Sequence, residues 1–132
     1  MMKPSQKGVG LIELILAVAV FVVGSASVAH LFIGARSAAL FSLQNNQAVF
    51  LSKEGIEEAR AVRNNIGFSE LEPSSDHITL DGVEFTREVE VNKAGEQALV
   101  SSSVEWDSLK GRESLSISEI LTDWDSGEAD VE

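Results

Sequence analysis

Glu13 is the residue of this sequence whose setting is chemically most unusual. It follows Lys7-Gly8-Val9-Gly10-Leu11-Ile12 and stands directly before Leu14–Ala35, a run of 22 residues without Asp, Glu, Lys or Arg. A carboxylate within or at the edge of a membrane is costly, and such residues usually pair with a cation or serve a function. Glu13 is therefore the first candidate for functional chemistry, and a positive group is its expected partner.

The rest of the sequence gives little support for catalysis. There is no cysteine, the histidines are His30 and His77, and no nucleophile–base pair or phosphate-binding glycine loop is recognisable. The pattern Asp123-x-Asp125-x-Gly127-Glu128 resembles part of a calcium loop but lacks the glutamate at the twelfth position. We therefore expect no enzyme activity, no cofactor and no metal site, and we interpret residues 127–132 as a solvated acidic tail.

The apolar run has the length of a membrane span. As a helix, its 22 residues rise about 33 Å, which matches a hydrocarbon core of about 30 Å. Lys3 and Lys7 precede the run and favour a cytoplasmic N-terminus, so we expect a single pass with the C-terminal part outside the cytoplasm. Two alternatives are a secretory signal, whose apolar core is shorter, and a plain signal anchor, which leaves Glu13 unexplained.

The chain beyond the apolar run is short and acidic. Its 97 residues, Arg36 to Glu132, carry 8 basic and 20 acidic side chains, a net charge of −12. This charge argues against direct binding to the nucleic-acid backbone. The length allows one small domain, which no disulfide can stabilise.

Helical periodicity continues beyond the apolar run. Small and apolar residues recur at steps of three and four, which predicts one buried face on a helix from Val9 to about Asn65, with its stop at Asn64-Asn65-Ile66-Gly67. This stripe consists of Ala48, Leu51, Gly55, Ala59, Val62 and Ile66. In the membrane half, Gly24-Ser25-Ala26-Ser27 indicates either close packing against other helices or a segment that melts on leaving the lipid.

After Pro73 the sequence alternates between apolar and polar residues, as strands do. Asp81-Gly82 predicts a tight hairpin turn, and the further turns are expected at Asn92–Glu96 and Asp107–Arg112. The expected inward residues are Ile78 and Leu80, then Val83, Phe85, Val89 and Val91, then Ala98, Val100, Val104 and Trp106, then Leu115 and Ile117. Arg87 interrupts the second strand and is expected either to pair with an acid or to end the packing there. The sequence thus predicts an α+β fold in which a four-stranded antiparallel meander covers the helix.

The N-terminal segment looks like the class III signal of type IV pilins and type II secretion pseudopilins. In that family prepilin peptidase cuts after a glycine, here Gly8, and methylates the new terminal amine, here on Val9, so that Glu13 is the fifth residue of the mature chain. Leu11, Ile12 and Glu13 fit the family pattern. Val9 and Gly10 replace its usual Phe or Met and Thr or Ser.

Two later stretches resemble accessory pilins, namely Leu51–Asn64 and the closing Leu121-Thr122-Asp123-Trp124, which is similar to their last strand. The resemblance implies a cleaved leader (1–8), a transmembrane and polymerisation half of the helix (9–35), an amphipathic half (36–66), a sheet domain (67–126) and the acidic tail (127–132). It therefore implies a pilin-like fold.

The resemblance also implies a function, that of a minor or accessory pilin or pseudopilin in a type IV pilus or type II secretion-like filament. The implied partners are prepilin peptidase, other pilin or pseudopilin subunits, an inner-membrane assembly platform and membrane lipid. The implied location is the inner membrane, followed by the extracytoplasmic filament. The alternative is a single-pass anchored binding domain that does not polymerise and binds a cationic partner or calcium.

Overall fold

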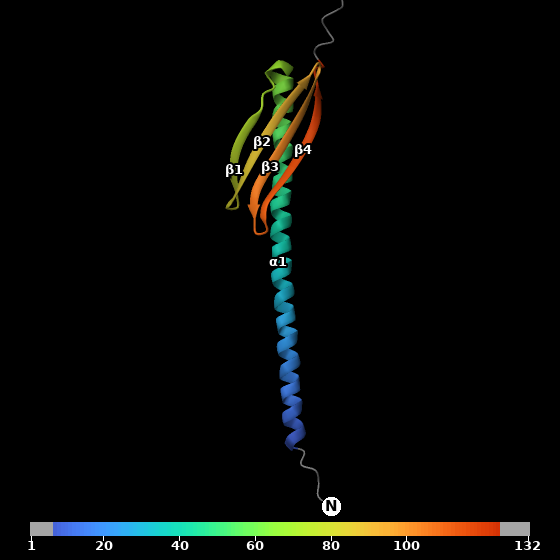
Figure 1. Cartoon of the computed structure of the whole chain (residues 1–132), viewed down its shortest axis with the longest axis vertical. Helices are drawn as coiled ribbons and strands as arrows, with labels where there is room; N and C mark the ends of the chain where they lie inside the picture. The colour runs from blue at the N-terminus through green and yellow to red at the C-terminus, as the bar shows by residue number, and fades with distance from the viewer. Residues whose placement is uncertain (1–6, 125–132) are drawn as a thin grey trace, which may run out of the picture. The chain divides into compact units, whose positions relative to one another are not determined.

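A computed structural model describes the backbone of residues 7–124 and the side chains from residue 10 onward (Figure 1). The elements are α1 (Lys7–Asn65), the short 3-10 helix η1 (Phe68–Glu70), β1 (Ser74–Leu80), β2 (Val83–Ala94), β3 (Gln97–Ser108) and β4 (Gly111–Thr122). The chain divides into two compact units, one ending at Leu40 and the other beginning at Phe41. The fold is α+β, with one long helix and a four-stranded antiparallel meander.

The first unit is the N-terminal part of α1. Its large apolar side chains are exposed, for example Leu11 at 63%, Phe21 at 74% and Phe32 at 70%. Among the described residues, α1 is the one helix long and apolar enough to cross a membrane, a test that a signal sequence also passes. The small-residue segment around Gly24 is helical, and Ser27 Oγ donates a hydrogen bond of 2.9 Å to the carbonyl of Val23.

The helix ends where the sequence predicts. The amides of Ile66 and Gly67 both donate to the carbonyl of Val62, at 2.9 and 3.1 Å. Gly67 has a φ of 136°, a conformation that a side chain disfavours and that glycine adopts freely. The stop at Asn64-Asn65-Ile66-Gly67 is therefore confirmed.

The sheet has the order β1-β2-β3-β4, so each strand pairs with its neighbours in sequence and β1 and β4 form the edges. Asp81 and Gly82 both have positive φ, as the predicted tight turn requires. The next two turns were predicted too long. Pairing continues to Ala94↔Gln97 and to Ser108↔Gly111, which leaves two-residue turns at Gly95–Glu96 and Leu109–Lys110.

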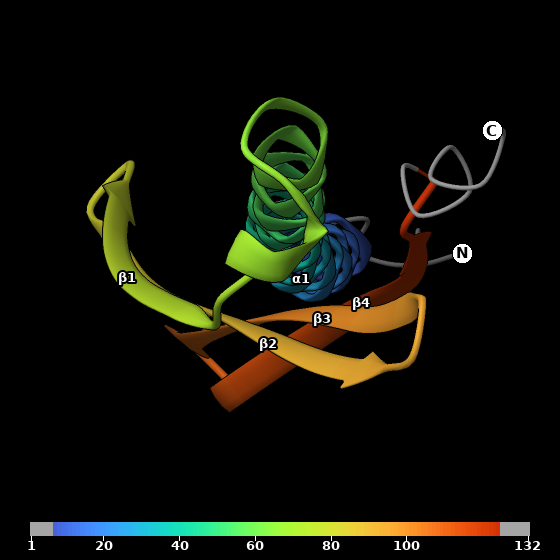
Figure 2. The same ribbon diagram turned by 90° about the horizontal axis from the view of Figure 1, so that it is seen from above.

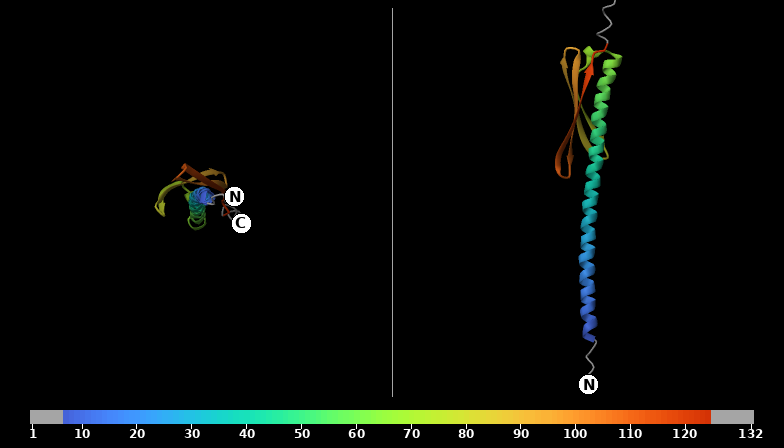
Figure 3. Two further views of the ribbon diagram at one scale, coloured as in Figure 1. Left: turned by 90° about the horizontal axis from the view of Figure 1, so that it is seen from below. Right: turned by 90° about the vertical axis from the view of Figure 1, so that its right-hand side faces the viewer.

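In the second unit the sheet packs on one side of the helix, over its C-terminal part (Figures 2 and 3). The buried core comprises Ala48, Leu51, Ile56, Ala59, Leu71, Phe85, Val89, Ala98, Val100, Val104, Trp106 and Leu121. The alternation of β2 and β3 is thus confirmed, as is most of the helical stripe. The prediction that Ile66 belongs to the buried stripe was wrong. Ile66 is 69% exposed because the helix ends there, whereas Ser52 and Ile56 are buried and were not predicted.

A further correction concerns the last strand. Leu121 and Thr122 are the end of β4, whereas Asp123 and Trp124 lie beyond it. Leu121 is buried and Trp124 is 65% exposed, so the strand stops where its side chains leave the core.

Candidate functional site

The residues predicted for processing and assembly lie at the start of α1. Gly8 and Val9 are in its first turns, and Glu13 follows four residues after Val9 with an exposed side chain. Residues four apart on a helix share a face. No basic side chain pairs with Glu13 within the part of the chain whose side chains are described. Among the described side chains, Glu13 is thus a carboxylate without a basic partner on an otherwise apolar surface.

A second group of interacting charged side chains surrounds Arg87. The sequence indicated only that Arg87 itself was unusual. This arginine is on the inward face of β2 and is 5% exposed. Its Nε and Nη2 donate to Asp76, its register partner on β1, at 3.0 and 2.8 Å. Its Nη2 also donates to Glu58 at 3.1 Å, and its Nη1 to Glu54 at 3.3 Å. The carbonyl of Leu51 accepts a further bond at 3.3 Å.

The Arg87 cluster therefore links one guanidinium to three carboxylates on two elements. The sequence expectation that Arg87 pairs with an acid is confirmed. Glu54 and Glu58 would repel each other at a spacing of four on an isolated helix, but here both face the same cation. Their side chains remain 45% and 56% exposed, so only the arginine is deeply buried.

The pKa of Arg87 reflects this balance. Burial alone would lower the pKa, but the hydrogen bonds and charges of Asp76 and Glu58 outweigh it and raise the pKa above its ordinary value. The group therefore stays charged at every physiological pH. Its chemistry is that of a fixed electrostatic contact between α1, β1 and β2.

Gly55 lies beside the Arg87 cluster, where the helix backbone packs tightly against the sheet. A Cβ at this position would lie 2.6 Å from Ser102 Oγ and 3.0 Å from Val89 Cγ2. Ser52, one turn earlier, donates a buried hydrogen bond of 2.6 Å to the carbonyl of Ser102. The glycine of the predicted stripe thus sets the distance between helix and sheet.

The end of the second unit carries a hollow of about 490 Å³ between the helix terminus and the chain after β4. Its lining includes Arg63, Phe68, Asp123 and Trp124. Asp123 begins the pattern that resembles a calcium loop, but Asp125, Gly127 and Glu128 lie outside the described residues, as does the predicted tail 127–132. Among the residues that are described, no group of three or more His, Asp or Glu side chains could hold a metal ion.

Comparison with protein-family models, with curated proteins and with solved structures finds no match to this chain. The architecture is nevertheless pilin-like. A long apolar N-terminal helix continues into a segment that packs on a four-stranded antiparallel sheet. The N-terminal helix is consistent with a single membrane span or a signal sequence.

Proposed function

We propose that this chain is a minor or accessory pilin or pseudopilin, a structural subunit of a type IV pilus or type II secretion-like filament. The observation that carries the proposal is Glu13, a single carboxylate directly before the charge-free run Leu14–Ala35 of a helix that continues into a helix–sheet domain. A plain membrane anchor accounts for the apolar residues but not for Glu13. Prepilin peptidase would release the amine of Val9 by cutting after Gly8.

The proposed mechanism pairs Glu13 of one subunit with the Val9 amine of a neighbour. Opposite charges attract far more strongly in an apolar medium than in water, although desolvation removes part of this gain. The charge pair would set the register between subunits, and apolar contact between their helices would supply most of the cohesion. Assembly would then require cleavage, because the nitrogen of Val9 is part of a peptide bond until the leader is removed.

The accessory role rests on charge. With a net charge of −12 beyond the apolar run, identical copies repel one another, and salt screens this repulsion only beyond about 8 Å. Dilution among less acidic subunits reduces the repulsion. The assembly platform and the other subunits named above are the proposed partners.

Gly8→Leu is expected to block processing, because the peptidase requires a small residue at this position. The uncut precursor should accumulate in the membrane, heavier by eight residues, as intact-mass spectrometry would show. Gly8→Ala keeps a small residue and should still be cut. A mature N-terminus at Val9 in the leucine variant would rule out this cleavage position. Retention of Met1 in the wild type, or loss of the whole apolar run, would instead favour the anchored or secreted alternatives.

Glu13→Gln is expected to reduce incorporation into filaments at least about tenfold, which corresponds to about 1.4 kcal/mol. The glutamine keeps the shape of the side chain but cannot neutralise an amine. Glu88→Gln, an exposed acid on β2, is the matched control and should assemble normally. Quantitative immunoblotting of sheared filaments measures both variants, and equal incorporation would show that charge pairing does not drive assembly.

A further inference from the structure

The turn between β3 and β4 exposes an apolar side chain at its tip. Leu109 is 80% exposed, more than any other large hydrophobic side chain that the structure describes. Single exposed leucines are common, but this one is followed by Lys110 and lies at the end of a long hairpin. An apolar residue beside a cation is the combination that membrane-surface segments use.

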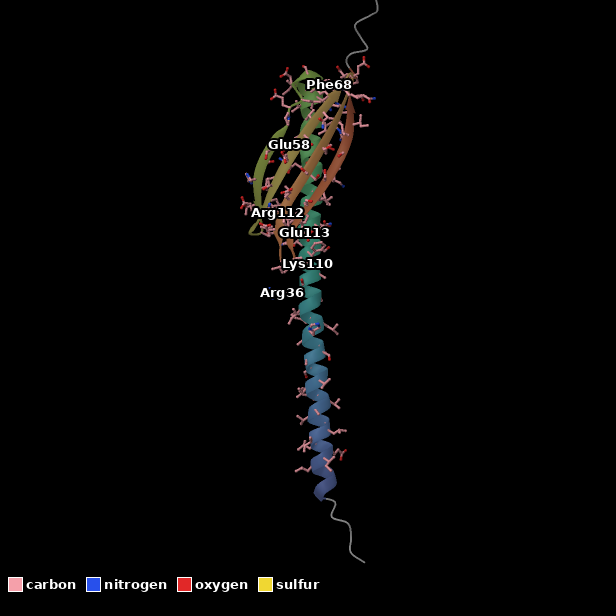
Figure 4. All side chains as sticks on the ribbon, in the orientation of Figure 1. Arg36, Glu58, Phe68, Lys110, Arg112 and Glu113 are labelled. Atoms are coloured by element: carbon pink, nitrogen blue, oxygen red, sulfur yellow. The ribbon has the colours of Figure 1, made fainter. Side chains whose placement is uncertain are left out.

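The tip has a fixed position in the second unit. Lys110 is labelled in Figure 4. Its Nζ lies 5.0 Å from the centre of the Phe41 ring, so the end of the hairpin lies beside the first residue of that unit. The Lys110 amide also donates to Ser108 Oγ at 3.1 Å, which closes the turn. These contacts hold Lys110 beside Phe41, and Leu109 precedes it in the same two-residue turn.

Phe41 is only six residues beyond Ala35, the last residue of the charge-free run. Six residues rise about 9 Å as a helix, and they reach at most about 20 Å in any conformation. The polar layer of each leaflet is about 5–8 Å thick. Because α1 is continuous through these residues, the helical rise applies, and about 9 Å is little more than the thickness of this layer. When the apolar run spans a bilayer, Phe41 and the hairpin tip therefore lie at the outer edge of the headgroup layer.

The charges around the tip decide which lipid it fits. Arg112 is close in sequence, but its Nε lies 3.5 Å from Asp107, and Glu113 adds a further acid. The whole extramembrane part carries a net charge of −12. An anionic bilayer would therefore repel the domain. A zwitterionic phospholipid offers a phosphate to Lys110 without a net negative surface.

We propose that the Leu109–Lys110 tip docks on zwitterionic phospholipid headgroups while the subunit is anchored in the membrane. Leu109 contacts the headgroup layer from its outer side, and the Lys110 ammonium contacts lipid phosphate. This inference rests on the membrane anchoring of the proposed function. It adds a second lipid contact that holds the domain at the bilayer before the subunit leaves it.

The absence of cysteine allows a direct test with the full-length chain. Leu109→Cys, labelled with a fluorophore, is reconstituted in phosphatidylethanolamine–phosphatidylcholine vesicles that contain a headgroup spin-labelled lipid. Leu99→Cys, an exposed leucine ten residues earlier on the outer side of β3, is the matched control. We expect quenching at position 109 to be several-fold stronger than at position 99. Adding Lys110→Glu to the Leu109→Cys chain should weaken the quenching, as should replacing the lipid with phosphatidylglycerol.

The outcomes separate this inference from the function on which it rests. Equal quenching at both positions, in vesicles that retain the chain after an alkaline wash, would overturn the docking while leaving the anchor intact. Loss of the chain in that wash would overturn the anchor and the docking together. Unchanged quenching after Lys110→Glu would overturn the phosphate contact.

Discussion

Replacing Arg87 with alanine is expected to destabilise the sheet domain by about 3 kcal/mol. The substitution leaves three carboxylates facing one another without their cation, and it opens a cavity under β2. The cost falls at the lower end of the range for a broken buried ion pair, because the carboxylates are about half exposed and keep contact with water. Urea unfolding of the full-length chain in detergent, followed by tryptophan fluorescence, measures the loss.

Arg112→Ala is the matched control for this experiment. Arg112 is 73% exposed and pairs with Asp107 across β3 and β4, so its loss should cost less than about 1 kcal/mol. Arg87→Lys should give an intermediate result, since an ammonium keeps the charge but cannot reproduce the planar fork. If Arg87→Ala and Arg112→Ala lower stability equally, the Arg87 cluster does not hold the helix to the sheet.

Ala59→Asp is expected to have a still larger effect and to leave the domain unfolded at room temperature. Ala59 is 8% exposed and belongs to the cluster with Ile56, Leu71 and Val89. A carboxylate at this position would lie among apolar side chains, and the penalty should exceed about 3 kcal/mol in a domain whose total stability is of the order of 5 kcal/mol. Loss of near-ultraviolet circular dichroism would report the unfolding.

The same substitution two residues later separates burial from helix propensity. Ala61 is exposed on α1. Ala61→Asp therefore destabilises the helix only through the lower helix propensity of aspartate, because the carboxylate stays in water. We expect Ala61→Asp to remain folded, as should Glu57→Ala on the same exposed side. Similar melting of Ala59→Asp and Ala61→Asp would mean that the sheet does not cover this face of the helix.

Features set by neighbouring residues could be predicted from the sequence. The stop at Gly67 and the turn at Asp81-Gly82 depend on a glycine that accepts positive φ, and both were found. The lengths of the later turns could not be predicted in this way. Cross-strand pairs such as Lys93↔Ala98 extend the strands into residues that have turn-like composition. Periodicity also predicted that the buried stripe continues to Ile66. The structure buries the stripe only as far as the sheet covers the helix, and Ile66 lies beyond this cover.

The Arg87 cluster shows why sites are harder to predict than elements. Its carboxylates are 11, 29 and 33 residues from Arg87 in sequence, so only the packed fold brings them together. The one usable signal was a charged residue in an otherwise apolar alternation. Glu13 is the opposite case. The sequence alone selects it as a candidate, whereas its proposed partner lies on another molecule.

The position of β4 at the sheet edge has a practical consequence for handling this protein. β4 has 12 residues with neither lysine nor proline, whereas the other edge strand, β1, has seven and directly follows Pro73. The charges of β4 lie near its two ends, and its central residues 114–118 are uncharged. A long edge with an uncharged centre invites backbone pairing between molecules, which leads to aggregation in concentrated samples. A lysine in place of the exposed Ser116, at the centre of β4, would be a rational solubilising change for crystallisation or NMR work.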